Sequence, residues 1–135
     1  MSEIKTTLSE LKQRFPDYDG RGYDIAGFVW FQGWNDMYNG FQDEYAVNMK
    51  NFIRDVRKDL AKPNLPFAIG IMGQNGFAPA KGNMAIVKAA QASMNDVPEF
   101  AGNVRAIPTD VYWDKRADAA FPTWRDNVAE WDKLG

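Results

Sequence analysis

The chain contains no cysteine and no histidine among its 135 residues. The lack of cysteine excludes disulfides, thiol nucleophiles and thiolate metal ligands. The lack of histidine removes the general base of a serine triad and the nitrogen ligand of the common zinc and iron sites. Any chemistry of this chain must therefore use carboxylates, lysines or amides, or be shared with another chain.

Other features are scarce. Serine occurs only at Ser2, Ser9 and Ser93. No apolar run approaches the ~20 residues of a transmembrane helix, and the N-terminal segment has no signal-peptide core, so the chain carries no export address and its compartment is not predicted. The net charge is −2 without a long basic run. This pattern predicts neither a nucleic-acid nor a membrane partner.

The composition is that of an ordinary globular protein, with 45% hydrophobic and 25% charged residues. The length fits one domain, residues 1–135, with a real core. Apolar runs predict strands over residues 25–31, 65–73 and 103–109, and helices are expected between and around them. Helices are predicted over residues 7–14, from the segment after residue 39 to Pro63, over 84–94, and near the C-terminus with Trp124, Val128 and Trp131 on one side.

Capping-box spacing predicts two helix starts, at Thr7 with Glu10 and at Asn39 with Gln42. In the second of these helices the apolar residues recur at helical spacing. They predict one buried face made of Tyr45, Met49, Phe52, Ile53, Val56 and Leu60.

Strands that alternate with helices predict right-handed βαβ units and a parallel sheet. The first run, 25–31, is apolar throughout, which is typical of a strand buried on both faces. Three such strands leave unpaired edges, and the helices of this chain can cover one face and part of the other. We therefore expect an α/β fold that is incomplete, whose sheet edge a homo-oligomer or a complementing chain would cover.

Polar residues follow each predicted strand, at the edge where α/β sheets bind ligands. Either they form a site or they are ordinary strand-end and loop-capping residues. Gly33 would let a ligand approach the backbone, and the Asn35 amide could donate to a developing oxyanion. Removal of one such donor raises the barrier of acyl transfer by roughly 2.7–4 kcal/mol. The converging residues are Gln32, Asn35, Asp36, Gln74, Asn75, Thr109 and Asp110.

Several segments, in order, resemble the interior of sialate O-acetylesterase-type carbohydrate esterases, which are SGNH hydrolases with a flavodoxin-like α/β/α fold. The resemblance runs from about Gly22 to the C-terminus. The segments that carry it are GYDIAGFVWFQGWNDM, FIRDVRKDL, NLPFAIGIMG, KAAQASM, PEFAGNVRAI and WRDNVAEWDKLG.

The resemblance implies deacetylation of O-acetylated carbohydrates by a serine nucleophile, without a cofactor or metal. It implies an oxyanion hole that uses a glycine N–H and the Asn of a Gly-x-Asn-Asp block, here Gly33 to Asp36. Many sugar esterases carry Gln-Gly-Glu in this block instead, so either Asn35 or Gln32 is the donor. Trp34, Asp36, Gln74 and Asn75 are the expected substrate-binding residues.

The chain departs from the family pattern in two places. No segment matches the glycine-preceded serine block, and no histidine is present. We therefore expect an internal segment, or a chain truncated at both ends, that is inactive alone. The alternative is a non-catalytic, esterase-derived module for carbohydrate binding or assembly.

Two further alternatives concern single residues. Trp34, Trp113 and Trp124 could stack on a sugar, although core or interface packing is the expected role of at least two of them. Lys88 and Gln91 lie in a segment that resembles the family, but a solvated helical face explains them equally well.

Overall fold

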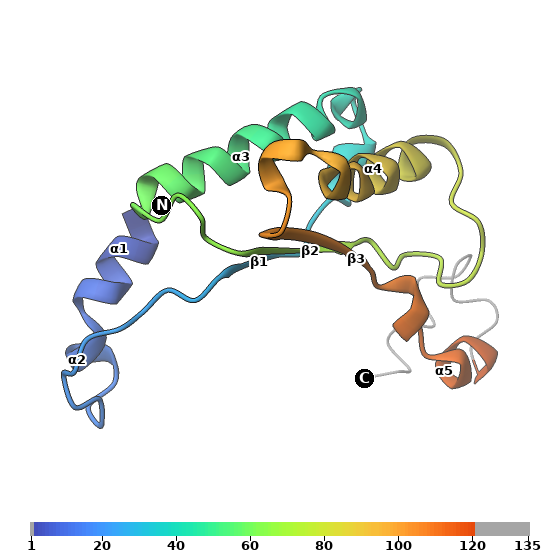
Figure 1. Ribbon diagram of the computed structural model, residues 1–135. Coiled ribbons are helices and arrows are strands. Elements are labelled where there is room, and N and C mark those ends of the chain that lie inside the picture. The colour runs from blue at the N-terminus through green and yellow to red at the C-terminus, as the bar shows by residue number, and fades with distance from the viewer. Residues whose placement is uncertain (1, 121–135) are drawn as a thin grey trace.

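The computed structural model describes residues 2–120, which form one parallel sheet with helices packed on it (Figure 1). The strands are β1 (Phe28–Trp30), β2 (Phe67–Ile71) and β3 (Val104–Pro108). The α-helices are α1 (Ser2–Ser9), α2 (Leu11–Arg14), α3 (Tyr45–Asp59), α4 (Gly82–Ala92) and α5 (Lys115–Ala120). Short 3-10 turns are η1 (Asn35–Met37), η2 (Phe41–Asp43), η3 (Ser93–Asp96), η4 (Pro98–Phe100) and η5 (Asp110–Tyr112).

The three strands lie in the order β1-β2-β3, and both pairs are parallel. Phe67 of β2 is opposite Phe28 on one side and Val104 on the other. Right-handed crossovers that always step in the same direction place their helices on the same face. Accordingly, α3 and α4 lie together on one side of the sheet (Figure 1). The predicted incomplete, flavodoxin-like α/β architecture is confirmed.

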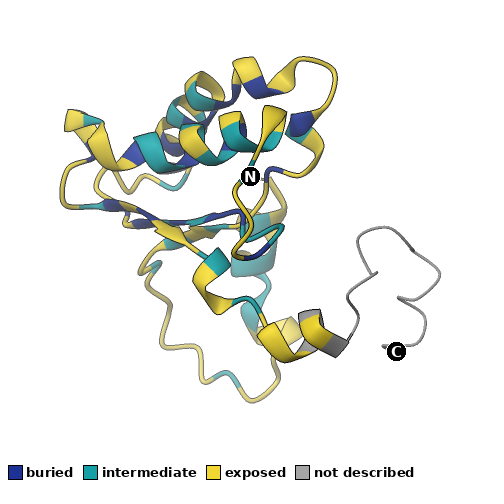
Figure 2. Cartoon of the chain, turned by 90° about the vertical axis from the view of Figure 1, so that its right-hand side faces the viewer, coloured by how far each residue is buried: buried dark blue, intermediate teal, exposed yellow. Residues whose placement is uncertain are grey.

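The first strand differs from its prediction. It spans only Phe28–Trp30 and alternates between partly buried and exposed side chains. Val29 is 77% exposed and Phe31 is 66% exposed, so burial on both faces is wrong for this strand within the described residues. The reason is that α3 and α4 cover a single face, and Figure 2 shows exposed residues on the side of the sheet away from them.

The core lies between the sheet and these two helices. The predicted face of α3 is confirmed: Tyr45, Met49, Ile53 and Val56 are buried, while Phe52 and Leu60 are partly buried against them. From the sheet the core receives alternate side chains of β2 and β3, as expected for strands with one covered face. They are Phe67, Ile69, Ile71, Val104 and Ala106.

Both predicted capping boxes are wrong. Thr7 lies inside α1, which is followed by the separate short helix α2. Asn39 and Gly40 have φ values of +59° and +83°, so they form a turn ahead of η2, and Glu44, without a side-chain cap, precedes α3. Gln42 is instead buried. The 3-10 turns shift the helix start because they bring the chain back from the sheet edge before α3 begins.

The later elements agree better with the sequence prediction. The helix expected over 84–94 is observed as α4, continued by η3, and the third strand falls inside 103–109. The C-terminal helix with Trp124, Val128 and Trp131 lies outside the described residues.

Arg57 on α3 joins the helix layer to the start of the sheet. Its guanidinium donates to the Leu65 carbonyl at 3.0 and 3.2 Å and to Asn103 Oδ1 at 2.6 Å. It also stacks near the Phe67 and Phe100 rings, and burial lowers its pKa. A buried charge is tolerated here because its donors are matched by oxygen acceptors.

We predict that Arg57→Met lowers the free energy of unfolding by roughly 2–3 kcal/mol, because it leaves the Leu65 carbonyl and Asn103 without their donor. Urea denaturation measures this change. The neighbouring exposed residue provides a matched control, since Lys58→Met should change stability by no more than ~0.5 kcal/mol. Equal effects of the two substitutions would contradict a structural role for Arg57.

Candidate functional site

The backbone after β1 turns at Gly33, where it passes close to α4. Gly33 is buried and has φ +149°, a conformation that L side chains rarely adopt. A Cβ added there would lie 2.9 Å from Gln91 Nε2 and 2.9 Å from Met72 Sδ. The glycine therefore lets the end of β1 pack directly on the helix and on the end of β2.

Gln91 on α4 is fully buried and connects three elements. Its Oε1 accepts the Met72 N–H at 3.0 Å, and its Nε2 donates to the Gln32 carbonyl at 2.7 Å and to Tyr45 Oη at 3.2 Å. The Tyr45 hydroxyl in turn donates to the same Gln32 carbonyl at 3.0 Å. Burial raises the pKa of Tyr45 and so keeps this hydroxyl protonated.

These contacts bear on whether Gln91 and Lys88 simply belong to a solvated face of α4. A solvated helical face is wrong for Gln91, because its amide is inside the protein and hydrogen bonded. Lys88 is also largely covered, with a side chain 15% exposed, and its Nζ lies 3.1 Å from the Asp110 carboxylate.

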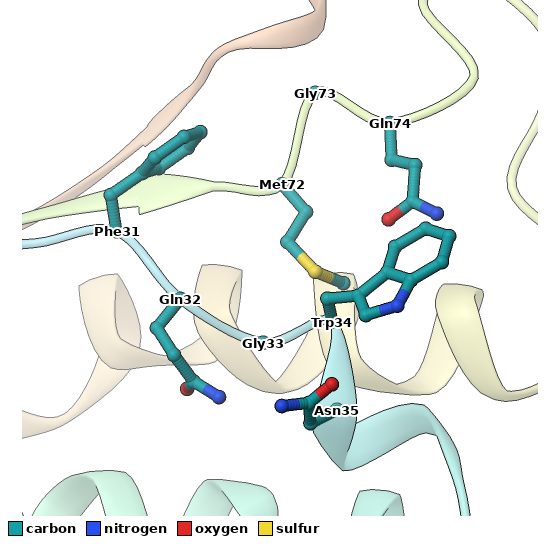
Figure 3. A pocket seen from close by; sticks show the side chains of 8 residues that line it. All are labelled: Phe31, Gln32, Gly33, Trp34, Asn35, Met72, Gly73 and Gln74. Atoms are coloured by element: carbon teal, nitrogen blue, oxygen red, sulfur yellow. The ribbon is translucent and has the colours of Figure 1, made fainter.

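A pocket of about 270 Å³ opens where β1 and β2 end (Figure 3). This volume is just below the range of about 300–1,000 Å³ for small-ligand sites. Figure 3 shows the chain after β1 forming one side and the chain after β2 the other. The lining residues are Phe31, Gln32, Gly33, Trp34, Asn35, Met72, Gly73 and Gln74.

Most of the residues predicted from the sequence thus meet at this pocket. Four predicted residues do not line it: Asp36, Asn75, and the two from the end of β3, Thr109 and Asp110. The Asp36 carboxylate accepts a hydrogen bond from Gln32 Nε2 and faces an adjacent hollow beside Tyr45 and Trp30. Asn75, with φ +69°, lies in the loop after β2.

The end of β3 contributes packing rather than pocket lining. Thr109 Oγ1 donates to the Ile71 carbonyl at 2.7 Å, and a Cβ on Gly73 would lie 2.7 Å from that hydroxyl oxygen. With Asp110 held by Lys88, both predicted rim residues of this strand have structural partners.

The amides at the pocket differ in their partners. The Gln32 side chain is bound to Asp36, and its Oε1 lies 3.4 Å from the Tyr45 hydroxyl. The exposed Asn35 side chain has no hydrogen-bond partner within residues 2–120. The Trp34 side chain is 52% exposed and makes an edge-to-face contact with Tyr38 at 6.5 Å. Asn35 and Trp34 are therefore free to meet a ligand.

Sequence reasoning did not assign Phe31 and Met72 to the pocket. A glycine inside β2 was the available signal, because such a glycine often marks a close approach by another group. A Cβ on Gly70 would lie 2.3 Å from the Phe31 ring, so the ring lies across the sheet at this glycine.

A family model described as carbohydrate esterase, sialic acid-specific acetylesterase, matches residues 5–114. The chain belongs to this family. The pocket and the Gln91 contacts lie inside the matched region, whereas the C-terminal segment WRDNVAEWDKLG lies beyond it. No curated protein and no solved structure gave a significant match.

Residues 2–120 of this esterase-family chain lack two other features. No helix in that range is long and apolar enough to cross a bilayer. Within the same range no three or more acidic side chains gather in a way that could hold a metal ion.

We predict that Gly33→Ala destabilises the protein by roughly 2–4 kcal/mol, because strain at positive φ adds to overlap with Gln91 and Met72. Gly40→Ala is the matched control, since Gly40 also has positive φ but its Cβ would meet nothing within 4 Å. The control should cost about 1–2 kcal/mol. Thermal or urea unfolding of both variants measures the difference, and a smaller effect at Gly33 would refute the close packing.

Proposed function

We propose that this chain supplies the oxyanion-binding wall of an SGNH-type carbohydrate O-acetylesterase. Two donors without partners in residues 2–120 support this function: the Gly33 N–H and the Asn35 side-chain amide. Both belong to residues that line the same pocket. Donors directed at the ester carbonyl stabilise the negative charge that develops on its oxygen during acyl transfer.

Asn35 is the better candidate for the side-chain donor. Gln32 Nε2 uses one of its two N–H groups on the Asp36 carboxylate, which fixes the orientation of that amide, whereas both N–H groups of the Asn35 amide lack a partner within residues 2–120. Asp36 then acts on Gln32 rather than on the sugar. The half-exposed Trp34 ring and the Gln74 amide, which line the same pocket, would contact the carbohydrate beside the acetyl group.

The nucleophile and the base come from outside this chain. It has no histidine, and its serines are poorly placed. Ser2 and Ser9 lie on α1, away from the pocket, and Ser93 Oγ donates to the Ala90 carbonyl at 2.7 Å. A complementing chain or further sequence would add these groups, and the exposed sheet face around Val29 and Ile107 offers it an apolar surface.

A second candidate function is carbohydrate binding without catalysis. It is favoured by the combination of an exposed Trp34 beside the pocket and the lack of histidine. In that case Asn35 and Gln74 would hold a sugar ligand and not a reacting ester.

We predict that the purified chain releases acetate from p-nitrophenyl acetate or an O-acetylated sialic acid no faster than a heat-denatured sample, because its own residues include no serine–histidine pair. A fluorophosphonate probe should likewise leave its serines unlabelled. A rate above that of the control, lost in Ser93→Ala, would contradict the assignment of the nucleophile to another segment.

Ligand binding distinguishes the two proposed functions, the oxyanion-binding wall of an esterase and the non-catalytic carbohydrate-binding module. Titration with O-acetylated and with deacetylated sialic acid is followed by the amide NMR signals of Gly33 and Asn35. If the chain is an oxyanion-binding wall, the Gly33 and Asn35 signals should shift mainly with the acetylated sugar. Asn35→Ala should then weaken the binding of that sugar about tenfold. Equal binding of both sugars would support the carbohydrate-binding module instead.

A further inference from the structure

We infer that Gln91 and Tyr45 are positioning residues that aim the Gly33 N–H into the pocket. This inference rests on the proposed function, in which that N–H receives the oxyanion. In this role, the helix layer sets the direction of a backbone N–H at the edge of the sheet.

The geometry of one peptide unit couples the Gln32 carbonyl to the Gly33 N–H. The Gln32 carbonyl and the Gly33 N–H belong to the same planar peptide group, and no cis peptide occurs in the described chain. In a trans peptide these two groups point in opposite directions. A hydrogen bond that fixes the carbonyl therefore also fixes the direction of the N–H.

Two donors hold that carbonyl from the helix side. Gln91 Nε2 on α4 lies 2.7 Å from the Gln32 oxygen, and Tyr45 Oη on α3 lies 3.0 Å from it. With both lone pairs of the oxygen occupied, the carbonyl is directed toward the helices. The Gly33 N–H is then directed away from α3 and α4, toward the side on which the pocket opens.

Two further contacts of Gln91 hold the Gln32–Gly33 peptide group in place. Gln91 Oε1 accepts the Met72 N–H at 3.0 Å, so the same amide fixes the opposite wall of the pocket. Gln91 also lies 2.9 Å from where a Gly33 Cβ would be, which leaves no room for the peptide to rotate toward the helix.

Packing alone does not require an amide at this position. An apolar side chain of similar size could fill the space without the desolvation cost of a buried amide. An amide also fixes the direction of both strand ends, because its oxygen accepts the Met72 N–H after β2 and its nitrogen donates to the Gln32 carbonyl after β1. The Gly33 N–H, which has no acceptor within residues 2–120, is left for a ligand.

The orientation of the Gly33 N–H can be measured as its ¹⁵N–¹H residual dipolar coupling in a weakly aligned sample. We compare the wild-type chain with Gln91→Met, which keeps the side-chain length, and with Tyr45→Phe, which keeps the ring. Asn95→Ala is the matched control, because Asn95 also bridges backbone groups, the Ala106 carbonyl at 3.1 Å and the Ala106 N–H at 2.8 Å, away from the pocket.

We expect the Gly33 coupling to change strongly in Gln91→Met and less in Tyr45→Phe, while the couplings of α3 and β2 stay within error. The control should leave Gly33 unchanged. If Gln91→Met does not fold, Tyr45→Phe must still shift the Gly33 coupling. An unchanged Gly33 coupling in folded Gln91→Met, or in Tyr45→Phe where only that variant folds, would overturn the inference and leave a structural role alone.

A second arm uses acetate as the probe, since it is the expected product. Acetate should shift the wild-type Gly33 amide signal and bind about tenfold more weakly to Gln91→Met. If the coupling changes but acetate does not bind the wild-type chain, the positioning holds and the proposed oxyanion role fails. If acetate binds equally to both proteins, the oxyanion role stands and the positioning role is refuted.

Discussion

The buried amide of Gln91 is the contact on which the pocket edge of this protein depends. It supplies a donor to the end of β1 and an acceptor to the backbone after β2, and it meets the Tyr45 hydroxyl of α3. Without it, the Met72 N–H would be buried without an acceptor, at a cost of about 1–3 kcal/mol, and the Gln32 carbonyl would keep only the Tyr45 hydroxyl as a donor. The glycine at position 33 follows from the same contact, because a larger residue would collide with the amide.

The second constraint is the handedness of the chain. Sequential parallel strands joined by right-handed crossovers place α3 and α4 on one face of the sheet. That face receives Ile69, Phe67 and Ala106, while Val29, Phe31 and Ile107 remain exposed on the other. The same topology gathers the strand ends at one edge, so the pocket and the open apolar face are consequences of one arrangement.

Membership in a carbohydrate esterase family agrees with the polar groups at the pocket, but the serine and histidine of a serine triad are absent from it. The family is described as acting on acetylated sialic acid, yet the chain has no histidine and no serine at the pocket. Its polar groups there are amides and a backbone N–H, which can stabilise a charge but cannot act as general base. In the function that we propose, the part of this chain in the reaction is therefore stabilisation and positioning.

Much of the fold is readable from local patterns. The periodicity of α3 identified its buried face, and the apolar runs located β2 and β3. Local patterns failed where tertiary contacts decide the outcome. The capping patterns predict helix starts at Asn39 and Thr7, but Asn39 lies in a turn and α1 begins before Thr7. The predicted first strand is longer than β1 and is covered on one face only, because the burial of a strand depends on what packs on each of its faces.

The order of the elements, the parallel sheet, the family resemblance and the polar block from Gln32 to Asp36 can all be read from local sequence patterns. The hydrogen-bond partners of each amide at the pocket depend on the tertiary packing. The Asn35 amide has no hydrogen-bond partner within residues 2–120, whereas the Gln32 amide is oriented by its hydrogen bond to Asp36. The role of Gln91 was equally hidden, since its amide bonds a carbonyl 59 residues away. Hydrogen-bond direction depends on how distant segments pack, and no local spacing records it.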